Sequence, residues 1–285
     1  MTSRHQTARE NPPTRWVAGA EPRFVHRYGR WAVVTGASDG IGREFARSVA
    51  ACGIDVVLVA RRRDALDRFA SELRCEYDVD TRTLAVDLTA PTAVDAVIDA
   101  TGSLDVGLLV AAAGYGTSGA FLTLARDAEL GMIDVNCRAV TALSHAFGGR
   151  FAARGRGGIV LLSSLLAFQG VGRAATYAAT KAFVQSLAEG LRVELAPAGV
   201  DVIAAAPGPT RSGFAARARM RMTRTTSAEV VARQTLAALG RRTTVRPGWL
   251  SKLLEWSLKP TPRGVRVRIV SRIMHGMTRD QHGVA

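Results

Sequence analysis

The chain has 285 residues, 47% of them hydrophobic, and 38 basic against 24 acidic residues give it a net charge of +14. This length and composition predict one globular domain with a substantial core. Three cysteines without metal-ligand spacing provide neither a disulfide framework nor a metal site, so we interpret Cys52, Cys75 and Cys137 as buried thiols of a protein in a reducing cytosol.

The charge itself allows nucleic-acid binding, because a basic surface attracts phosphate. No nucleic-acid recognition motif accompanies it, and a general arginine bias explains much of it, so we expect no nucleic-acid partner. Residues 1–30 form a basic segment without the apolar stretch of a secretory signal, which favours a cytoplasmic location. The longest uncharged run, 106–125, is broken by glycines and is interpreted as a strand and a loop, not a membrane span.

Apolar runs alternate with helical patterns along most of the chain. Strands are predicted at Ala32–Thr35, Asp55–Ala60, Thr81–Val86, Asp105–Ala113, Gly158–Ser163, Val200–Ala206 and Thr243–Arg246. Helices are predicted at Ile41–Cys52, Asp64–Leu73, Pro91–Ala100, Ala125–Ala153, Ala175–Ala196 and Ala228–Leu239. This alternation predicts an α/β fold of the Rossmann type, a doubly wound parallel sheet in a single domain covering residues 31–247.

A glycine-rich segment, Thr35–Gly42, joins the first predicted strand to the first predicted helix. Glycines in this position let the backbone turn tightly and approach a pyrophosphate, whose charge then lies at the positive end of the helix. The segment therefore predicts a dinucleotide site. Its candidate cofactor-binding residues are Gly36, Ser38, Asp39, Gly40, Ile41 and Gly42.

The end of the second predicted strand indicates which dinucleotide binds. An enzyme that uses NAD(H) places an acid there for the ribose 2′-hydroxyl, but this chain has Arg61, Arg62 and Arg63 and no acid before Asp64. Guanidinium groups bind a 2′-phosphate, which a carboxylate would repel. We therefore predict NADP(H) rather than NAD(H), held by Arg61 and Arg62.

Tyr177 and Lys181 lie four residues apart in a predicted helix, so both side chains emerge from one face. An ammonium beside a phenol favours the phenolate, and we expect Lys181 to lower the pKa of Tyr177 towards neutrality. Such a tyrosine could exchange a proton with an alcohol or a carbonyl. The chain has only three lysines among its basic residues.

With these motifs in order, residues 31–241 resemble the classical short-chain dehydrogenase/reductase family, and the first motif resembles its long-chain 3-ketoacyl-CoA reductase and 17β-hydroxysteroid dehydrogenase group. The resemblance implies that Tyr177 is the acid/base, with Lys181 lowering its pKa and binding the nicotinamide ribose. It implies that Ser164, thirteen residues earlier, binds the substrate oxygen in preference to Ser163. It also implies that Asn136 bends a long helix and anchors a water.

The resemblance adds further cofactor contacts and one departure. The added contacts are Asp87, Leu88, Ala113, Gly114, Pro207, Gly208 and Thr210. The departure is at the end of the fourth predicted strand, where the family usually has Asn-Asn-Ala-Gly and this chain has Ala111-Ala112-Ala113-Gly114. We expect a looser neighbouring loop there, with Ala113 and Gly114 meeting the cofactor through their backbone.

These features predict an NADP(H)-dependent oxidoreductase that interconverts a carbonyl and a secondary alcohol. We expect pocket walls at Tyr115–Leu122, Leu165–Arg173 and Arg211–Thr226, the last a mobile lid with several arginines. An apolar wall with a cationic lid suits a lipophilic substrate, such as a 3-ketoacyl thioester or a steroid. The alternative is a catalytically silent cofactor-binding regulator or scaffold, which would not need the complete set Asn136, Ser164, Tyr177 and Lys181.

Residues 248–285 form a basic, apolar C-terminal extension. Within it, 248–277 combines two tryptophans and many aliphatic side chains with basic residues. This mixture suits peripheral contact with an anionic membrane, or packing on the domain or a partner subunit. Both helices at 125–153 and 175–196 have Ala-rich apolar faces, and the family resemblance implies that they assemble a homodimer or homotetramer.

Overall fold

Seven parallel strands form one sheet in the order β3-β2-β1-β4-β5-β6-β7. The computed structural model describes residues 21–221, 225–248 and 261–278. The strands are β1 (Trp31–Thr35), β2 (Asp55–Ala60), β3 (Thr81–Ala85), β4 (Val106–Ala111), β5 (Gly157–Leu162), β6 (Val200–Ala205) and β7 (Thr244–Val245). Strand order reverses next to β1, so a crevice is expected at the carboxyl ends of β1 and β4.

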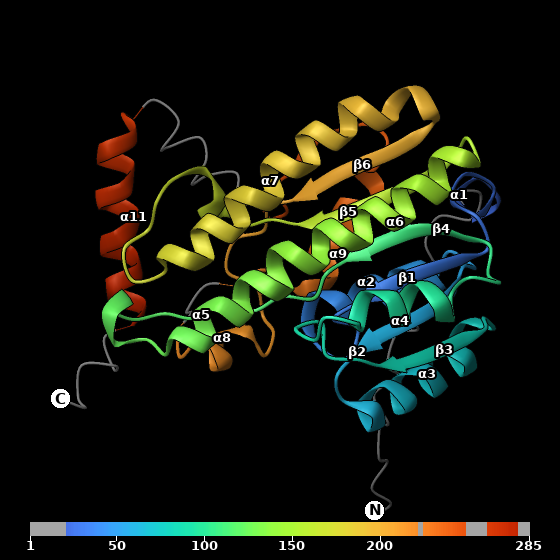
Figure 1. The fold of residues 1–285 in the computed structure, drawn as a ribbon, viewed down its shortest axis with the longest axis horizontal. Helices are drawn as coiled ribbons and strands as arrows, with labels where there is room; N and C mark the ends of the chain where they lie inside the picture. The colour runs from blue at the N-terminus through green and yellow to red at the C-terminus, as the bar shows by residue number, and fades with distance from the viewer. Residues whose placement is uncertain (1–20, 222–224, 249–260, 279–285) are drawn as a thin grey trace, which may run out of the picture.

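Helices cover both faces of the sheet (Figure 1). The long helices are α2 (Gly40–Ala50), α3 (Arg63–Tyr77), α6 (Ala139–Ala153), α7 (Ala175–Leu195), α9 (Ala228–Ala238) and α11 (Arg263–Met277). The short ones are α1 (Glu21–Tyr28), α4 (Ala93–Ala100), α5 (Arg126–Ile133) and α8 (Phe214–Arg217). Single turns are η1 (Phe121–Thr123), η2 (Asp134–Arg138), η3 (Leu165–Phe168) and η4 (Ala196–Ala198).

Side chains that alternate along the strands separate two cores. Ala32 and Val34 of β1 face the core beneath α2, α3 and α9, whereas Trp31 and Val33 face the core beneath α4, α6 and α7. Every residue of β2 except Ala60 is buried. Burial on both faces is what apolar parallel strands require, and the predicted doubly wound fold is confirmed.

The predicted elements differ from the observed ones mainly at their ends. Helix α3 continues to Tyr77, beyond the predicted end at Leu73, and stops where Asp78 adopts the left-handed conformation with φ of 54°. The single helix predicted at Ala125–Ala153 is divided by the π-helical turn η2. A π turn inserts an extra residue into the helical ladder, and such turns often mark functional sites.

The N-terminal helix α1 packs against the sheet although it lies in the segment assigned by sequence to a basic tail. Tyr28 is 5% exposed and belongs to the core beneath α2, with Phe24 and Val25 against it. The Tyr28 hydroxyl donates a hydrogen bond of 2.9 Å to the Asp201 carboxylate at the start of β6. This helix therefore closes the end of the sheet opposite the crevice.

Helix α11 lies beyond the carboxyl ends of the strands, beside the first turns of α7 (Figure 1). Val270 and Met274, four residues apart, are buried against Val171, Ala174 and Ala178. The described part of the C-terminal extension is thus packed on the domain, and the two tryptophans at 249 and 256 lie outside the described residues. None of the described helices is both long enough and apolar enough to cross a membrane.

Candidate active site

The glycine-rich turn between β1 and α2 leaves no room for side chains. Gly36 has φ of +70°, and a Cβ atom on it would lie 2.9 Å from the backbone of Ala113. A Cβ atom on Gly42 would lie 2.4 Å from the carbonyl oxygen of Gly36. The backbone of the turn is therefore pressed against its neighbours, and it forms a cradle that a phosphate group can approach closely at the start of α2.

A cavity of about 570 Å³ opens over this turn at the reversal of strand order. It is lined by the carboxyl ends of β1, β2, β3 and β4 and by the segment that follows β6. Most of the residues predicted to bind a dinucleotide line this cavity, namely Gly36, Ser38, Asp39, Gly40, Ile41, Gly42, Arg61, Arg62, Asp87, Leu88, Ala113 and Gly114. The shape and donor set of the cavity fit a dinucleotide.

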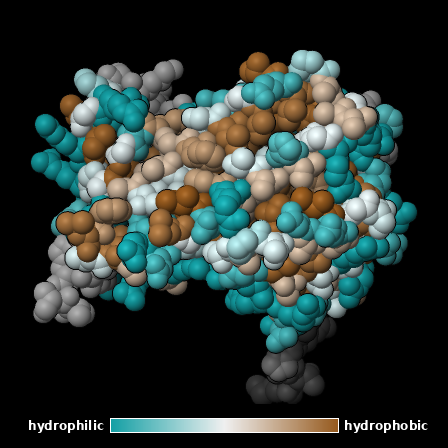
Figure 2. All heavy atoms as spheres, in the orientation of Figure 1, coloured by the Kyte–Doolittle hydropathy of each residue, from teal (hydrophilic) through white to brown (hydrophobic). Residues whose placement is uncertain are grey.

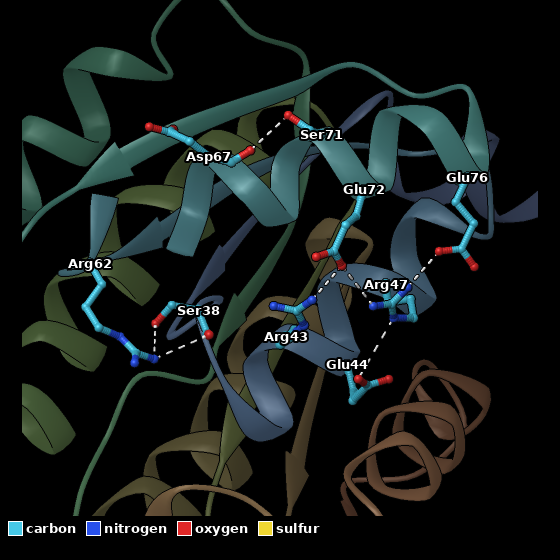
Figure 3. A network of polar contacts seen from close by, with 9 residues as sticks. All are labelled: Ser38, Arg43, Glu44, Arg47, Arg62, Asp67, Ser71, Glu72 and Glu76. Atoms are coloured by element: carbon cyan, nitrogen blue, oxygen red, sulfur yellow. Dashed lines mark hydrogen bonds and ion pairs between the residues drawn. The ribbon is translucent and has the colours of Figure 1, made fainter. Parts of the chain in front are cut away.

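Arg61 and Arg62 flank the entrance of this cavity from the end of β2. A guanidinium nitrogen of Arg62 lies 3.4 Å from both the carbonyl oxygen and the hydroxyl of Ser38 (Figure 3). Nη1 of Arg61 lies 3.8 Å from a carboxylate oxygen of Asp87. Two guanidinium groups are thus held next to the turn, where a phosphate on the adenosine ribose can accept hydrogen bonds from them.

The nearby arginines of α2 form ion pairs within the protein. On α2, Arg43 and Arg47 form ion pairs with Glu72 and Glu76 of α3 at 2.5 and 2.7 Å (Figure 3). These carboxylates neutralise the helix arginines and lie in the C-terminal half of α3, whereas Arg62 precedes the first residue of that helix. The charge at the cavity entrance is therefore distinct from the ion-pair network that joins the two helices.

A second cavity, of about 400 Å³, lies further along the carboxyl edge of the sheet. Ser164 follows β5, and Tyr177 and Lys181 are one turn apart on α7; all three line this cavity. Pro207, Gly208 and Thr210, which follow β6, line it as well. Ile41 and Gly114 line both cavities, so the two spaces meet where the nicotinamide end of a dinucleotide would lie.

Ser164 faces the tyrosine and Ser163 does not. The Ser164 hydroxyl acts to lower the pKa of the Tyr177 phenol, and it accepts a hydrogen bond of 3.2 Å from the backbone N–H of Leu166. Ser163 is turned into the protein, where its hydroxyl donates 3.0 Å to the carbonyl oxygen of Lys181. The geometry therefore favours the serine chosen by its spacing from Tyr177.

Asn136 lies in the π turn η2 and is completely buried. Its amide oxygen accepts from the N–H of Tyr115 at 3.2 Å, and its amide nitrogen donates to the carbonyl oxygen of Tyr115 and the hydroxyl of Thr180, both at 3.0 Å. These bonds join η2 to α7 and to the loop after β4. Asn136 thus holds that loop against the helix that carries Tyr177 and Lys181.

The expected effect of Lys181 on Tyr177 needs correction. Burial raises the pKa of the Tyr177 phenol to about 12, although the hydrogen bond from Ser164 opposes this rise. Burial also lowers the pKa of the Lys181 ammonium to about 8. The Lys181 ammonium lies 5.7 Å from the centre of the Tyr177 ring and donates 2.7 Å to the carbonyl oxygen of Leu162. Desolvation outweighs the attraction between the two groups in the ligand-free protein.

The segment that replaces the usual Asn-Asn pair is held by other bonds. The N–H of Ala113 donates 3.0 Å to the hydroxyl of Thr35 at the end of β1. A Cβ atom on Gly114 would lie 2.8 Å from the amide oxygen of Asn136 and 3.4 Å from Nζ of Lys181. The missing side-chain amides therefore do not open a gap between this backbone and the catalytic side chains.

The segment after β6 covers the junction between the two cavities, and the sequence did not single out its contacts. The N–H of Gly213 donates 3.2 Å to the Asp39 carboxylate in the glycine-rich turn. The Phe214 ring lies 5.3 Å from the Tyr177 ring, and the Arg217 guanidinium lies 4.4 Å from the centre of the Tyr115 ring. Part of the predicted lid, 222–224, falls outside the described residues.

The walls of the second cavity differ in part from those predicted. Leu165, Leu166 and Phe168 line it as expected, but no residue of the predicted wall Tyr115–Leu122 does. Phe121 and Leu122 are instead 59% and 93% exposed. Helix α11 takes that place, with five side chains at its border: Arg266, Val270, Ile273, Met274 and Met277. The i, i+4 spacing of Val270 and Met274 was the available signal for a packed helix.

The cysteines also require a correction. Cys75 is exposed, and Cys52 and Cys137 are only partly buried. Cys75 lies on the exposed face of α3, between Arg74 and Glu76 in the sequence. Burial raises the pKa of the Cys137 thiol, which keeps it protonated beside Lys181.

The chain matches known proteins over most of its length. Residues 30–223 match the family model for short chain dehydrogenase. The chain is 34% identical to a 7beta-hydroxysteroid dehydrogenase of Clostridium sardiniense over 66% of this chain and 72% of that protein. It is 35% identical to a very-long-chain 3-oxoacyl-CoA reductase of Podospora anserina over 65% of this chain, but it spans only 56% of that relative.

A solved structure shows the same fold. A short-chain dehydrogenase from Sphingobium yanoikuyae in complex with NADPH is 32% identical and superimposes with a TM-score of 0.75, covering 83% of this chain and 94% of that one. Strands β1 to β6, the glycine-rich turn and the site on α7 all lie within the region that matches the family model. This chain belongs to the short chain dehydrogenase family.

Proposed function

We propose that this protein is an NADP(H)-dependent oxidoreductase that interconverts a carbonyl and a secondary alcohol on a lipophilic substrate. The observation that carries the proposal is that Ser164, Tyr177 and Lys181 together line the second cavity, next to the cofactor cavity. A bound nicotinamide supplies or accepts the hydride. The protein positions the nicotinamide and the substrate and supplies the proton.

In reduction, Tyr177 donates its hydroxyl proton to the substrate oxygen, and Ser164 donates a hydrogen bond to the same oxygen and holds it there. In oxidation the proton returns to Tyr177. The raised pKa of about 12 keeps Tyr177 protonated, as an acid must be. The Lys181 ammonium donates a hydrogen bond to the carbonyl oxygen of Leu162, and with a pKa lowered to about 8 it can pass a proton back to Tyr177. Asn136 holds the π turn η2 against α7 through its hydrogen bond to Thr180.

The choice of NADP(H) is supported by Arg61 and Arg62, which stand where an acid would select NAD(H). The Sphingobium yanoikuyae relative is in complex with NADPH. The glycine cradle and the backbone of Ala113 and Gly114 would hold the cofactor along the crevice. Asp87 and Leu88 would border the adenosine, and Pro207, Gly208 and Thr210 would border the nicotinamide.

The lipophilic substrate is supported by the second cavity, whose walls are mainly leucine, phenylalanine, methionine and valine side chains. Two of the relatives act, by name, on a hydroxysteroid and on very-long-chain 3-oxoacyl-CoA. Purified protein with NADPH should reduce ketones of this size, and the reverse reaction should run with the alcohols and NADP⁺. Binding of NADPH without turnover on steroid, 3-oxoacyl thioester or long-chain ketones would favour a regulator or scaffold.

We further propose a homodimer or homotetramer formed through the exposed faces of α5 and α7. Figure 2 shows hydrophobic atoms gathered over this side of the molecule. Leu130 and Ile133 of α5 are 53% and 42% exposed, and Phe183 and Val193 of α7 are 43% and 75% exposed. Light scattering at micromolar concentration should give a mass above that of one chain, and Phe183→Glu should lower it.

Helix α11 exposes a second set of apolar side chains to solvent. Val265, Ile269 and Ile273 of α11 are 43%, 37% and 49% exposed, although Val270 and Met274 are packed on the domain. Peripheral membrane contact by 248–277 in a cytoplasmic protein remains a prediction. This prediction is tested by vesicle sedimentation: the protein should bind anionic vesicles at low salt and be released as the salt concentration rises.

A further inference from the structure

A third arginine borders the cofactor cavity, and it comes from the lid segment after β6. Arg217 is the last residue of helix α8 and lines this cavity together with Arg61 and Arg62, which follow β2. In the sheet, β2 and β6 are separated by β1, β4 and β5. The segment after β6 therefore extends back over the crevice to bring Arg217 to the cofactor cavity.

Helix α8 is anchored over the crevice at both of its ends. The N–H of Gly213, just before the helix, donates 3.2 Å to the Asp39 carboxylate in the glycine-rich turn. The Ser118 hydroxyl donates 2.5 Å to the carbonyl oxygen of Ala218, just after the helix. The backbone of Arg217 is thus held between the glycine-rich turn and the loop that follows β4.

The guanidinium of Arg217 lies over the Tyr115 ring, 4.4 Å from its centre. A guanidinium in this position uses its flat face, and its N–H donors point outward in the plane of the group. Partial burial and the like charge of Arg61 lower the pKa of Arg217, and Asp87, which acts to raise it, is paired with Arg61 at 3.8 Å. Two guanidinium groups therefore lie close enough to repel each other, and an anion between them would stabilise both.

We propose that Arg217 is a cofactor-binding residue, whose guanidinium donates hydrogen bonds to a phosphate of the bound dinucleotide and so holds α8 over the crevice. This inference rests on the proposed function and adds a contact to its cofactor site. The pyrophosphate and the 2′-phosphate share the chemistry that a guanidinium recognises. Phe214, on the same helix, lines both cavities and lies 5.3 Å from the Tyr177 ring. Phosphate binding at Arg217 thus also fixes a wall of the substrate cavity.

Equilibrium titration with NADPH tests the contact. Arg217→Met keeps an apolar side chain against the Tyr115 ring but removes the charge, and it should weaken NADPH binding about 10- to 100-fold. Arg217→Lys keeps the charge and should recover part of this loss. Arg211→Met is the matched control, because Arg211 is an exposed arginine of the same lid that borders neither cavity.

Titration with NADH separates the two phosphate acceptors, because NADH has the pyrophosphate but no 2′-phosphate. A loss in Arg217→Met with NADPH alone would assign the contact to the 2′-phosphate, and an equal loss with both dinucleotides would assign it to the pyrophosphate. Native affinity of Arg217→Met for both dinucleotides would overturn the proposal. So would an Arg217→Lys protein as weak as Arg217→Met, since the charge would then not be what binds.

Amide hydrogen exchange shows whether the phosphate holds the helix. Saturating NADPH should slow exchange in residues 213–221 of the native protein, and it should slow exchange much less in Arg217→Met at equal saturation. Neither measurement depends on turnover. Unchanged NADPH affinity in Arg217→Met, in a protein that reduces ketones, would overturn this inference alone. The expected loss of affinity, in a native protein that reduces no ketone, would overturn the proposed reaction alone.

Discussion

The two cavities of this protein are built in different ways. The cofactor cavity is formed by short segments that directly follow β1, β2, β3 and β4, and much of its surface is backbone. The substrate cavity is formed mainly by side chains from four distant parts of the chain: η3 after β5, α7, the segment after β6, and α11. One is fixed by local backbone geometry, and the other depends on how remote elements pack.

This difference separates reaction from specificity. At Gly36 and Gly42 the backbone lies so close to neighbouring backbone atoms that no side chain fits, and this constraint does not depend on the substrate. A wall of leucine, methionine and arginine side chains can change without disturbing the hydride or proton transfer. Substitutions in the cofactor half should therefore affect all substrates alike, whereas those in the substrate half should discriminate among them.

The largest expected effect comes from the tyrosine of the second cavity. Tyr177→Phe removes the exchangeable proton with little change in volume, and kcat should fall by about 10²–10⁴-fold. NADPH affinity, measured by fluorescence titration, should be retained. Lys181→Arg should also lose turnover, because a guanidinium does not fit the place of an ammonium held by the carbonyl oxygen of Leu162. Substantial activity in either variant would place the acid/base elsewhere.

The next effect tests the cofactor half alone. The double variant Arg61→Ala and Arg62→Ala should lose about 10- to 100-fold in NADPH affinity and little in NADH affinity. Arg63→Ala is the matched control, since Arg63 is the first residue of α3 and does not border the cavity. If the native protein bound the two dinucleotides equally, the assignment of the 2′-phosphate to these arginines would be wrong.

A third effect concerns the buried ammonium between the cavities. The pKa of Lys181 is lowered from 10.5 to about 8 in the folded chain. Between these values the unfolded chain binds a proton that the folded chain does not, so the free energy of unfolding should increase with pH. From pH 8 to 10 the gain is roughly 2 kcal/mol for the ligand-free protein.

Urea denaturation at several pH values between 8 and 10 measures this gain. Lys181→Met should abolish it, because the variant has no titrating group at that position. Tyr177, with a pKa raised from 10 to about 12, opposes this gain only near pH 10, where the phenol of the unfolded chain begins to ionise, and it is present in both proteins. A slope that persisted unchanged in Lys181→Met would show that another group is responsible.

The smallest effect concerns the contact that closes the lid on the glycine-rich turn. Asp39→Ala removes the hydrogen bond to Gly213, and NADPH should dissociate about fivefold faster, as expected for the loss of one exposed bond. Stopped-flow displacement measures the rate. Asp95→Ala, an exposed acid on α4, should leave the rate unchanged. An unaltered rate in Asp39→Ala would mean that this contact does not govern cofactor release.

The same contrast explains what could be predicted from the sequence. The strands, the glycine-rich turn and the set on α7 depend on local spacing, so they were predicted at their correct positions. Helix α11 was not predicted as a cavity wall, because its partners Val171 and Ala174 are about a hundred residues away in the chain. The contact between Asp39 and Gly213 is likewise long-range.

The pKa of Tyr177 could not be predicted for a related reason. A spacing of four residues places Lys181 on the same helix face, but it does not reveal how deeply either group is buried. Here the ammonium turns to the carbonyl oxygen of Leu162, and Ser164, not Lys181, contacts the phenol. Charge spacing is local information, whereas desolvation is a property of the complete fold.

The transfer of hydride is the central claim, and isotope transfer tests it most directly. NADPH with deuterium at the transferable nicotinamide position is incubated with excess protein and a lipophilic ketone, and the product is examined by mass spectrometry. The account predicts one deuterium on the carbinol carbon with the native protein and, in the same time, at least about 100-fold less product with Tyr177→Phe. Bound NADPH without deuterated alcohol, or equal product with Tyr177→Phe, would contradict it.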